Sequence, residues 1–80
     1  MSETEFDADV TIDSRGATCP GPLMDLIGKV KEVEPGTVIE LLTSDSSSKN
    51  DVPEWVDETP HEFLGAVEGD DFWRLYVEVV

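Results

Sequence analysis

The order in which hydrophobic periodicity changes along the chain limits its possible folds more than any other feature. Apolar and polar residues alternate over residues 6–12, which predicts a half-buried strand. From Pro20 onward, apolar residues recur at the three- and four-residue spacing of an amphipathic helix, which we expect to run to Val33. Pro35 and Gly36 then end this helix, and a second strand rich in valine, isoleucine and leucine is predicted over residues 37–44.

A second, shorter helix is predicted after this strand. Apolar residues fall at helical spacing from Val52 onward, and the helix is expected to end by Pro60. Its start is left open by Pro53, which is harmless near a first turn. A helix that began as early as Ser47 would lose a backbone hydrogen bond at this proline.

The last part of the chain predicts a hairpin. Strands over residues 63–67 and 72–80 are joined by a short polar turn that contains a glycine. The resulting order of strands and helices predicts an α+β fold, a two-layer sandwich with two helices on one face of a four-stranded mixed sheet. A length of 80 residues suffices for one small core, so we expect a single domain over residues 1–80, with residues 1–5 disordered.

The chain is strongly acidic. Its 19 acidic residues against 5 basic ones give a formal net charge of -14, which repels phosphate backbones and anionic membranes. We therefore expect no direct binding to nucleic acid. The acids are interleaved with patterned apolar residues, which favours a folded acidic surface over disorder. The scarcity of lysine is typical of proteins from salt-loaded cytoplasm and suggests a halophilic origin; the alternative is an ordinary acidic protein that avoids non-specific contacts.

Cysteine content and hydropathy bear on location. Cys19 is the only cysteine, so no internal disulfide can form, and a reducing, intracellular environment is favoured. No secretory signal pattern is present, and the apolar runs are far shorter than the roughly 20 residues that span a bilayer. We expect a soluble, cytoplasmic protein that does not act at a membrane.

Residues 13–23 form the most informative segment for chemistry. A strand ends there, a turn with Gly16 follows, and Cys19 precedes a helix whose first turn contains Pro20 and Pro22. A thiol at the positive end of a helix has its pKa lowered from about 8.5 to between roughly 3.5 and 7.5. We therefore predict that Cys19 is substantially thiolate at neutral pH, and that the two prolines fix the helix start.

Two other side chains are candidates for a role beside the thiol. Arg15 offers a cationic fork that could hold a persulfide or a partner's carboxylate; the alternative is an exposed arginine paired with Asp13 or Asp45. His61 could form a nucleophile pair with Cys19, but a lone histidine after a helix is more often a surface or capping group. One cysteine and one histidine make a poor zinc site, so we expect no metal and no cofactor.

The pattern R-G-x-x-C-P-x-P, which runs from Arg15 to Pro22, resembles the signature of the TusA/SirA family of sulfurtransferases. The resemblance extends from about residue 11 to the end of the chain. It continues through three further features: the Pro35-Gly36 turn, the acidic Asp45, and the D-V-P-E-W segment over residues 51–55. One departure is Pro60, because many family members have glycine before the His-Glu pair.

The resemblance implies the fold predicted above and a Cys19 that accepts sulfane sulfur as a persulfide. The donor would be a cysteine desulfurase or a rhodanese-like protein, and the acceptor another protein of tRNA thiolation, molybdenum-cofactor assembly or other sulfur metabolism. Supporting roles around Cys19 are predicted for five residues: Arg15, Gly16, Pro20, Pro22 and Asp45.

Two other functions stay open at this point. Cys19 could serve as a thiol redox sensor, although the chain offers no second cysteine to resolve an oxidised thiol. The chain could also be a regulatory or structural binding module whose acidic face docks a basic partner. Leu23 and Met24 are either part of the apolar helix stripe or a partner-docking patch beside the thiol.

Overall fold

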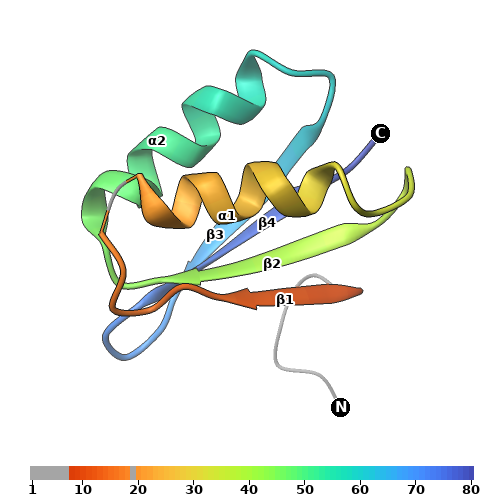
Figure 1. The fold of residues 1–80 in the computed structure, drawn as a ribbon. Helices are drawn as coiled ribbons and strands as arrows, with labels where there is room; N and C mark the ends of the chain where they lie inside the picture. Colours follow the sequence, from red (N-terminus) through yellow and green to blue (C-terminus); the bar gives the residue numbers. More distant parts are fainter. Residues whose placement is uncertain (1–7, 19) are drawn as a thin grey trace.

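The computed structural model describes residues 8–18 and 20–80, and these form a four-stranded sheet with two helices (Figure 1). The elements follow in the order β1 (Val10–Asp13), α1 (Gly21–Val30), β2 (Val38–Thr43), α2 (Ser46–Asp57), β3 (Glu62–Glu68) and β4 (Trp73–Glu78). The strand order in the sheet is β1-β2-β4-β3. β1 pairs with β2 in parallel and the other neighbours are antiparallel, so the predicted α+β fold with a mixed sheet is confirmed.

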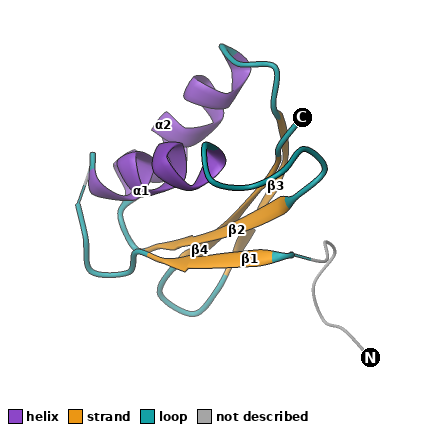
Figure 2. Ribbon diagram, turned by 45° about the vertical axis from the view of Figure 1, so that its right-hand side comes forward, coloured by secondary structure: helices purple, strands orange, loops and turns teal. Residues whose placement is uncertain are grey.

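Both helices lie on the same face of the sheet (Figures 1 and 2). The parallel pair β1 and β2 is connected through α1, whereas β3 and β4 form the closing hairpin. Within the described residues, no helix is both long enough and apolar enough to cross a membrane.

The core lies between the helices and the sheet. On β2, Ile39 and Leu41 are fully buried, and they alternate with residues that point to the other face. Leu26 of α1 and Val52 and Val56 of α2 pack in the same core cluster from the helical layer. Full burial of one such side chain stabilises a fold by about 1.5–3 kcal/mol, so this shared layer holds both helices against the sheet.

The first helix is shorter than predicted. It ends at Val30, whereas the apolar spacing indicated Val33. Val33 still packs against the core, although it follows the helix. The apolar spacing indicates which side chains are buried but not where the helical hydrogen bonds end. The predicted helix end was therefore three residues too late. Gly36 completes the turn with a φ of 94°, a conformation that residues with a Cβ rarely adopt.

The second helix begins early, at Ser46, and so contains Pro53 in its interior. The sequence left this start open because an interior proline removes one helical hydrogen bond. The helix is capped by Asp45, whose side chain accepts a hydrogen bond from the backbone N–H of Ser48. Capping at this position sets the start of the helix, and the interior proline is tolerated.

Candidate functional site

The predicted site residues gather at one end of the sheet. β1 and β2 both finish there, and α1 and α2 both begin there (Figure 1). Five predicted supporting residues lie in the connecting segments or at the helix starts: Arg15, Gly16, Pro20, Pro22 and Asp45. Cys19 itself lies outside the described residues, which include its neighbours Thr18 and Pro20. The predicted state of its thiol therefore stays a prediction.

The turn over residues 14–18 is tied to its surroundings at three points. The backbone N–H of Ser14 donates to the carbonyl oxygen of Leu42 at 2.8 Å, which continues the pairing with β2. The Ser14 hydroxyl, which is almost fully buried, donates to Asp25 Oδ2 of α1 at 2.7 Å. The N–H of Gly16 donates to Ser44 Oγ at 3.0 Å. The chain that leads to residue 19 is thus attached to a strand, a loop and a helix.

Arg15 forms a two-pronged ion pair with Asp13. Arg15 Nε lies 2.9 Å from Asp13 Oδ1, and Arg15 Nη2 lies 2.8 Å from Asp13 Oδ2. The hydrogen bonds from the Arg15 side chain, and then from its backbone N–H, lower the pKa of Asp13 from 3.8 to about 2. The same pairing raises the pKa of Arg15. Of the two carboxylates that the sequence offered to Arg15, the structure gives it Asp13.

The start of α1 shows how the prolines act. Pro20 occupies the N-cap position and makes no side-chain capping bond, while Pro22 lies in the first turn and is buried. The N–H of Gly21 donates to the carbonyl oxygen of Thr18 at 2.8 Å. Because Pro22 has no N–H, this first turn offers fewer free donors than an ordinary helix start.

Asp45 serves α2 at the same end of the sheet. One carboxylate oxygen, Oδ2, accepts from the Ser48 N–H at 3.0 Å and from the Ser48 hydroxyl at 2.9 Å. Its own N–H donates to Thr43 Oγ1 at 3.1 Å. These contacts give Asp45 a clear role in setting the start of the second helix.

A hollow of about 440 Å³ lies beside the turn that precedes Cys19. It is lined by Asp13, Arg15, Gly16, Ser44, Asp71 and Phe72. The last two residues come from the β3–β4 turn and were not predicted as site residues. No pattern in the sequence points to them, because they reach this place only through the pairing of β4 with β2.

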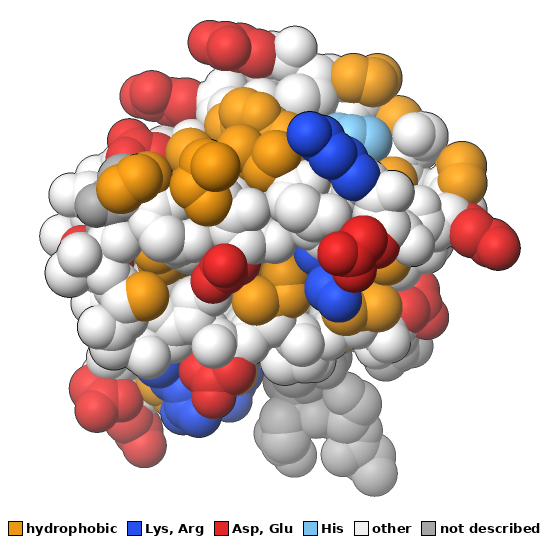
Figure 3. Space-filling view, in the orientation of Figure 1, with side chains coloured by type: hydrophobic (Ala, Val, Ile, Leu, Met, Phe, Trp, Pro, Cys, Tyr) orange, Lys and Arg blue, Asp and Glu red, His pale blue; other side chains and the backbone are white. Residues whose placement is uncertain are grey.

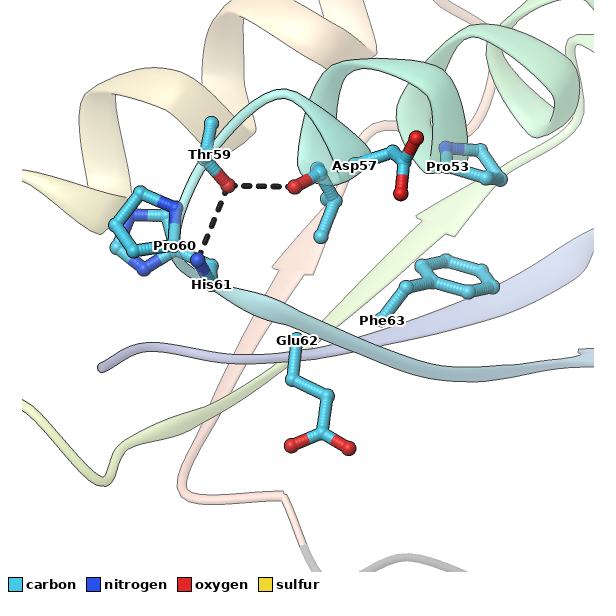
Figure 4. Close-up of a pocket in the computed structure, with 8 residues that line it drawn as sticks. Pro53, Asp57, Thr59, Pro60, His61, Glu62 and Phe63 are labelled. Carbon is cyan, nitrogen blue, oxygen red and sulfur yellow. Dashed lines mark hydrogen bonds between the residues drawn. The ribbon is translucent and has the colours of Figure 1, made fainter.

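His61 lies at the opposite end of the molecule. Its Nδ1 accepts a hydrogen bond from the N–H of Val80 at 3.2 Å, and its ring lies 6.2 Å from that of Trp55. It lines a separate hollow of about 460 Å³ between the end of α2 and the start of β3 (Figure 4). The six residues of β2 separate the two ends by roughly 20 Å, at about 3.3 Å per residue. His61 therefore binds the backbone near the C-terminus and lies far from the segment around residue 19.

The two residues of the possible docking patch differ in exposure. Leu23 packs against the core, as expected for the helix stripe, whereas Met24 is 58% exposed. Apolar side chains are visible over the helical layer in the space-filling view (Figure 3). Within residues 8–18 and 20–80, no group of three or more histidine, cysteine or acidic side chains is placed to hold a metal ion.

Comparison with known proteins gives a consistent result. The family model described as sulfurtransferase TusA matches residues 10–79. A relative from Archaeoglobus fulgidus, whose name places it among sulfur carrier proteins, is 48% identical over 69 residues, which cover 86% of this chain and 94% of the relative. The sulfur carrier protein TusA of Pseudomonas entomophila is 35% identical over 65 residues, or 81% of each chain.

A solved structure shares the fold. The SirA-like protein from Desulfitobacterium hafniense superposes with a TM-score of 0.79 and covers 86% of this chain and 95% of its own. The two sequences are 21% identical, so this likeness shows the common fold alone.

Proposed function

This chain belongs to the TusA sulfurtransferase family, and we propose that it carries sulfane sulfur as a persulfide on Cys19. The observation that carries the proposal is the position of Cys19 in the sequence, directly before Pro20 at the N-cap of α1. The neighbouring turn is held by Arg15, Gly16 and Ser14 through bonds to three different elements. The described segment that leads to residue 19 is therefore held by hydrogen bonds, which supports the proposal.

The proposed step is a thiol–persulfide exchange. The Cys19 thiolate attacks the terminal sulfur of a donor's persulfide, the donor's sulfur–sulfur bond breaks, and the donor's thiolate leaves. A new sulfur–sulfur bond forms on Cys19, and the proton of the terminal sulfur stays on it or passes to the donor thiolate. No external oxidant or reductant is consumed. Transfer onward repeats the same exchange, with the acceptor's thiolate as the attacking group.

The residues around Cys19 act by holding the chain. Pro20 and Pro22 set the start of α1, Gly16 allows the tight turn, and Asp45 starts α2 at the same end. Arg15 is neutralised by Asp13, so its contribution is to order the turn more than to attract an anion. In this proposal none of these five residues takes up sulfur itself.

Two protein partners follow from the proposal. The donor is a cysteine desulfurase or a rhodanese-like protein, and the acceptor belongs to tRNA thiolation, molybdenum-cofactor assembly or another branch of sulfur metabolism. The reaction takes place in the cytoplasm, where reducing conditions keep a single thiol free. The chain binds no nucleic acid directly, because its net charge of -14 opposes contact with phosphate backbones.

Mass spectrometry tests the proposal directly. Incubation with a cysteine desulfurase and cysteine, or with a rhodanese and thiosulfate, should add about 32 Da to the protein, the mass of one sulfur bound as a persulfide. Cys19→Ser should fold normally and gain nothing, because a hydroxyl differs little from a thiol in size but cannot form a persulfide. Reduction with a small thiol should remove the added mass.

If Cys19 is a redox sensor, sulfur donors should not add mass to the protein. If several donors leave the mass unchanged while hydrogen peroxide readily gives a reversible oxidation product at Cys19, the chain is a thiol sensor and not a carrier. A binding module without chemistry would retain its partner in the Cys19→Ser variant.

A further inference from the structure

The only two arginines of the chain lie against the same aromatic ring. The guanidinium carbons of Arg15 and Arg74 are each 5.0 Å from the centroid of the Phe72 ring. This distance is within the range of an attractive cation–π contact. Both arginines also lie near a carboxylate, with Arg15 at 2.8 Å from Asp13 and Arg74 at 3.6 Å from Glu40. The ring is therefore shared by two cations whose charges are already compensated.

Phe72 joins parts of the chain that are distant in sequence. It lies in the β3–β4 turn, directly before β4, while Arg15 lies in the turn that leads to Cys19. Figure 1 shows the two turns at the same end of the molecule. The planar fork of Arg15 is occupied at its edge by Asp13, which leaves the flat face of the guanidinium for the ring. Arg15 is thus held on one side by Asp13 and on another by Phe72.

The β3–β4 turn leaves space for the Phe72 ring next to Gly69. The N–H of Gly69 donates to the Phe72 carbonyl oxygen at 2.6 Å, which closes the turn. A Cβ at Gly69 would lie 3.1 Å from two ring carbons of Phe72, closer than ordinary van der Waals contact. The absence of a side chain at residue 69 therefore leaves the space that the Phe72 ring uses.

We propose that Phe72 is a positioning residue for sulfur transfer, which holds Arg15 and thereby the turn that precedes Cys19 in the chain. The role in sulfur transfer rests on the proposed function, whereas the ordering of the turn by Phe72 does not depend on it. If Phe72 orders the turn, the backbone amides of Gly16 and Ala17 owe part of their protection to it, because they donate to Ser44 Oγ and to the Ser14 carbonyl oxygen.

Three variants of the full chain test this role. Phe72→Leu keeps an apolar side chain but removes the ring, Phe72→Tyr keeps the ring, and Phe63→Leu makes the same change in β3, where the side chain packs against the core. We expect Phe72→Leu to speed hydrogen exchange at the Gly16 and Ala17 amides about two- to five-fold, the effect of losing one exposed cation–π contact. The initial rate of sulfur uptake from a rhodanese and thiosulfate should fall by a similar factor.

The other two variants decide whether the effect is specific. Phe72→Tyr should restore both readouts to the wild-type values, and Phe63→Leu should leave both unchanged. Equal exchange in Phe72→Leu and wild type would overturn the proposal, and so would an unchanged uptake rate or an equal effect of Phe63→Leu. If the wild-type protein takes up no sulfur, the proposed function fails, while amide exchange still shows whether Phe72 orders the turn.

Discussion

The carboxylate of Glu40 is stabilised by hydrogen bonds from the two neighbouring strands. It lies between the buried residues Ile39 and Leu41 on β2, so its side chain points to the face opposite the helices. Its carboxylate accepts hydrogen bonds from Thr11 Oγ1 at 2.9 Å and from the Tyr76 hydroxyl at 2.7 Å. Strands on both sides of β2 therefore contribute a donor, and the mostly buried charge is compensated.

The titration of Tyr76 tests this arrangement. Burial, and then the hydrogen bond to Glu40, raises the pKa of Tyr76 from 10.0 to about 12. Because the fold favours the neutral phenol, its contribution to stability is complete below pH 10 and is lost as the pH rises towards about 12. Tyr76 is the only tyrosine, so ultraviolet absorbance of the phenolate reports on it alone.

We expect a midpoint near 12 in the native protein and near 10 in urea. Glu40→Gln should bring the native midpoint down, because it removes the negative charge that opposes the phenolate. A native midpoint equal to that in urea would show that Tyr76 is neither buried nor bonded as described.

At this scale the sequence predicted candidate site residues that are close together in the chain, but not the tertiary contact that one of them makes. Arg15, Gly16, Pro20 and Pro22 are close to Cys19 along the chain, so a motif of fixed spacing identifies them. Phe72 reaches Arg15 only because β4 pairs with β2 and brings the β3–β4 turn to the same end. No local pattern encodes such a contact.

Among the secondary structure elements, α2 depends most on its cap. Its twelve residues include three serines, an asparagine and an interior proline, all of which are poor helix formers. The N-cap Asp45 accepts two hydrogen bonds from Ser48, whose side chain is fully buried. The loss of this cap should therefore weaken a helix that has little intrinsic stability.

Replacement of the cap has a defined expected cost. Asp45→Ala should lower the free energy of unfolding by about 1 kcal/mol or more, whereas Asp45→Asn should retain most of it because an amide oxygen can also accept the Ser48 N–H. Ser46→Ala, at an exposed position one residue later, is the matched control. Urea unfolding followed by far-ultraviolet circular dichroism measures all three. Equal midpoints for Asp45→Ala and Ser46→Ala would contradict the capping role.

The order and type of the elements could be predicted because each segment has a clear hydrophobic period. The ends of the helices could not, for two different reasons. Val33 continues the apolar stripe but packs on the core after α1 has ended, so periodicity alone places the end too late. Pro53 gives a strong local signal against an early start of α2, and the packing of Val52 and Val56 against the sheet outweighs it.

The whole molecule carries a large excess of negative charge. The net charge is -14, and three of the five cationic side chains are already paired, Arg15 with Asp13, Lys29 with Glu32, and Arg74 with Glu40. Acidic side chains are spread over the visible surface (Figure 3). At the end of α2, acidic residues also face the negative end of the helix dipole, and no basic residue lies in the last turn. Repulsion among the excess acidic side chains should therefore destabilise the folded state in dilute buffer.

Salt should relieve this repulsion and raise stability. The Debye length falls from about 10 Å at 0.1 M salt to about 3 Å at 1 M, so the repulsion between neighbouring surface charges is screened as well. Each kcal/mol of repulsion removed raises the Tm of a domain of this size by about 4–8 °C. We therefore expect the Tm, followed by circular dichroism, to rise by at least about 5 °C between dilute buffer and 1 M potassium chloride.

A charge variant separates screening from other effects of salt. Glu54→Gln, Asp57→Asn and Glu58→Gln together neutralise three exposed acids near the end of α2 and change the shape of the side chains little. If repulsion is the cause, this triple variant starts from a higher Tm in dilute buffer and gains less from salt, so the two curves converge at 1 M. Parallel curves would show that salt acts through hydration of the apolar surface instead. A wild-type Tm that is the same in dilute and molar salt would show that the fold already tolerates its charge, and the halophilic interpretation of the sequence would then lose its physical basis.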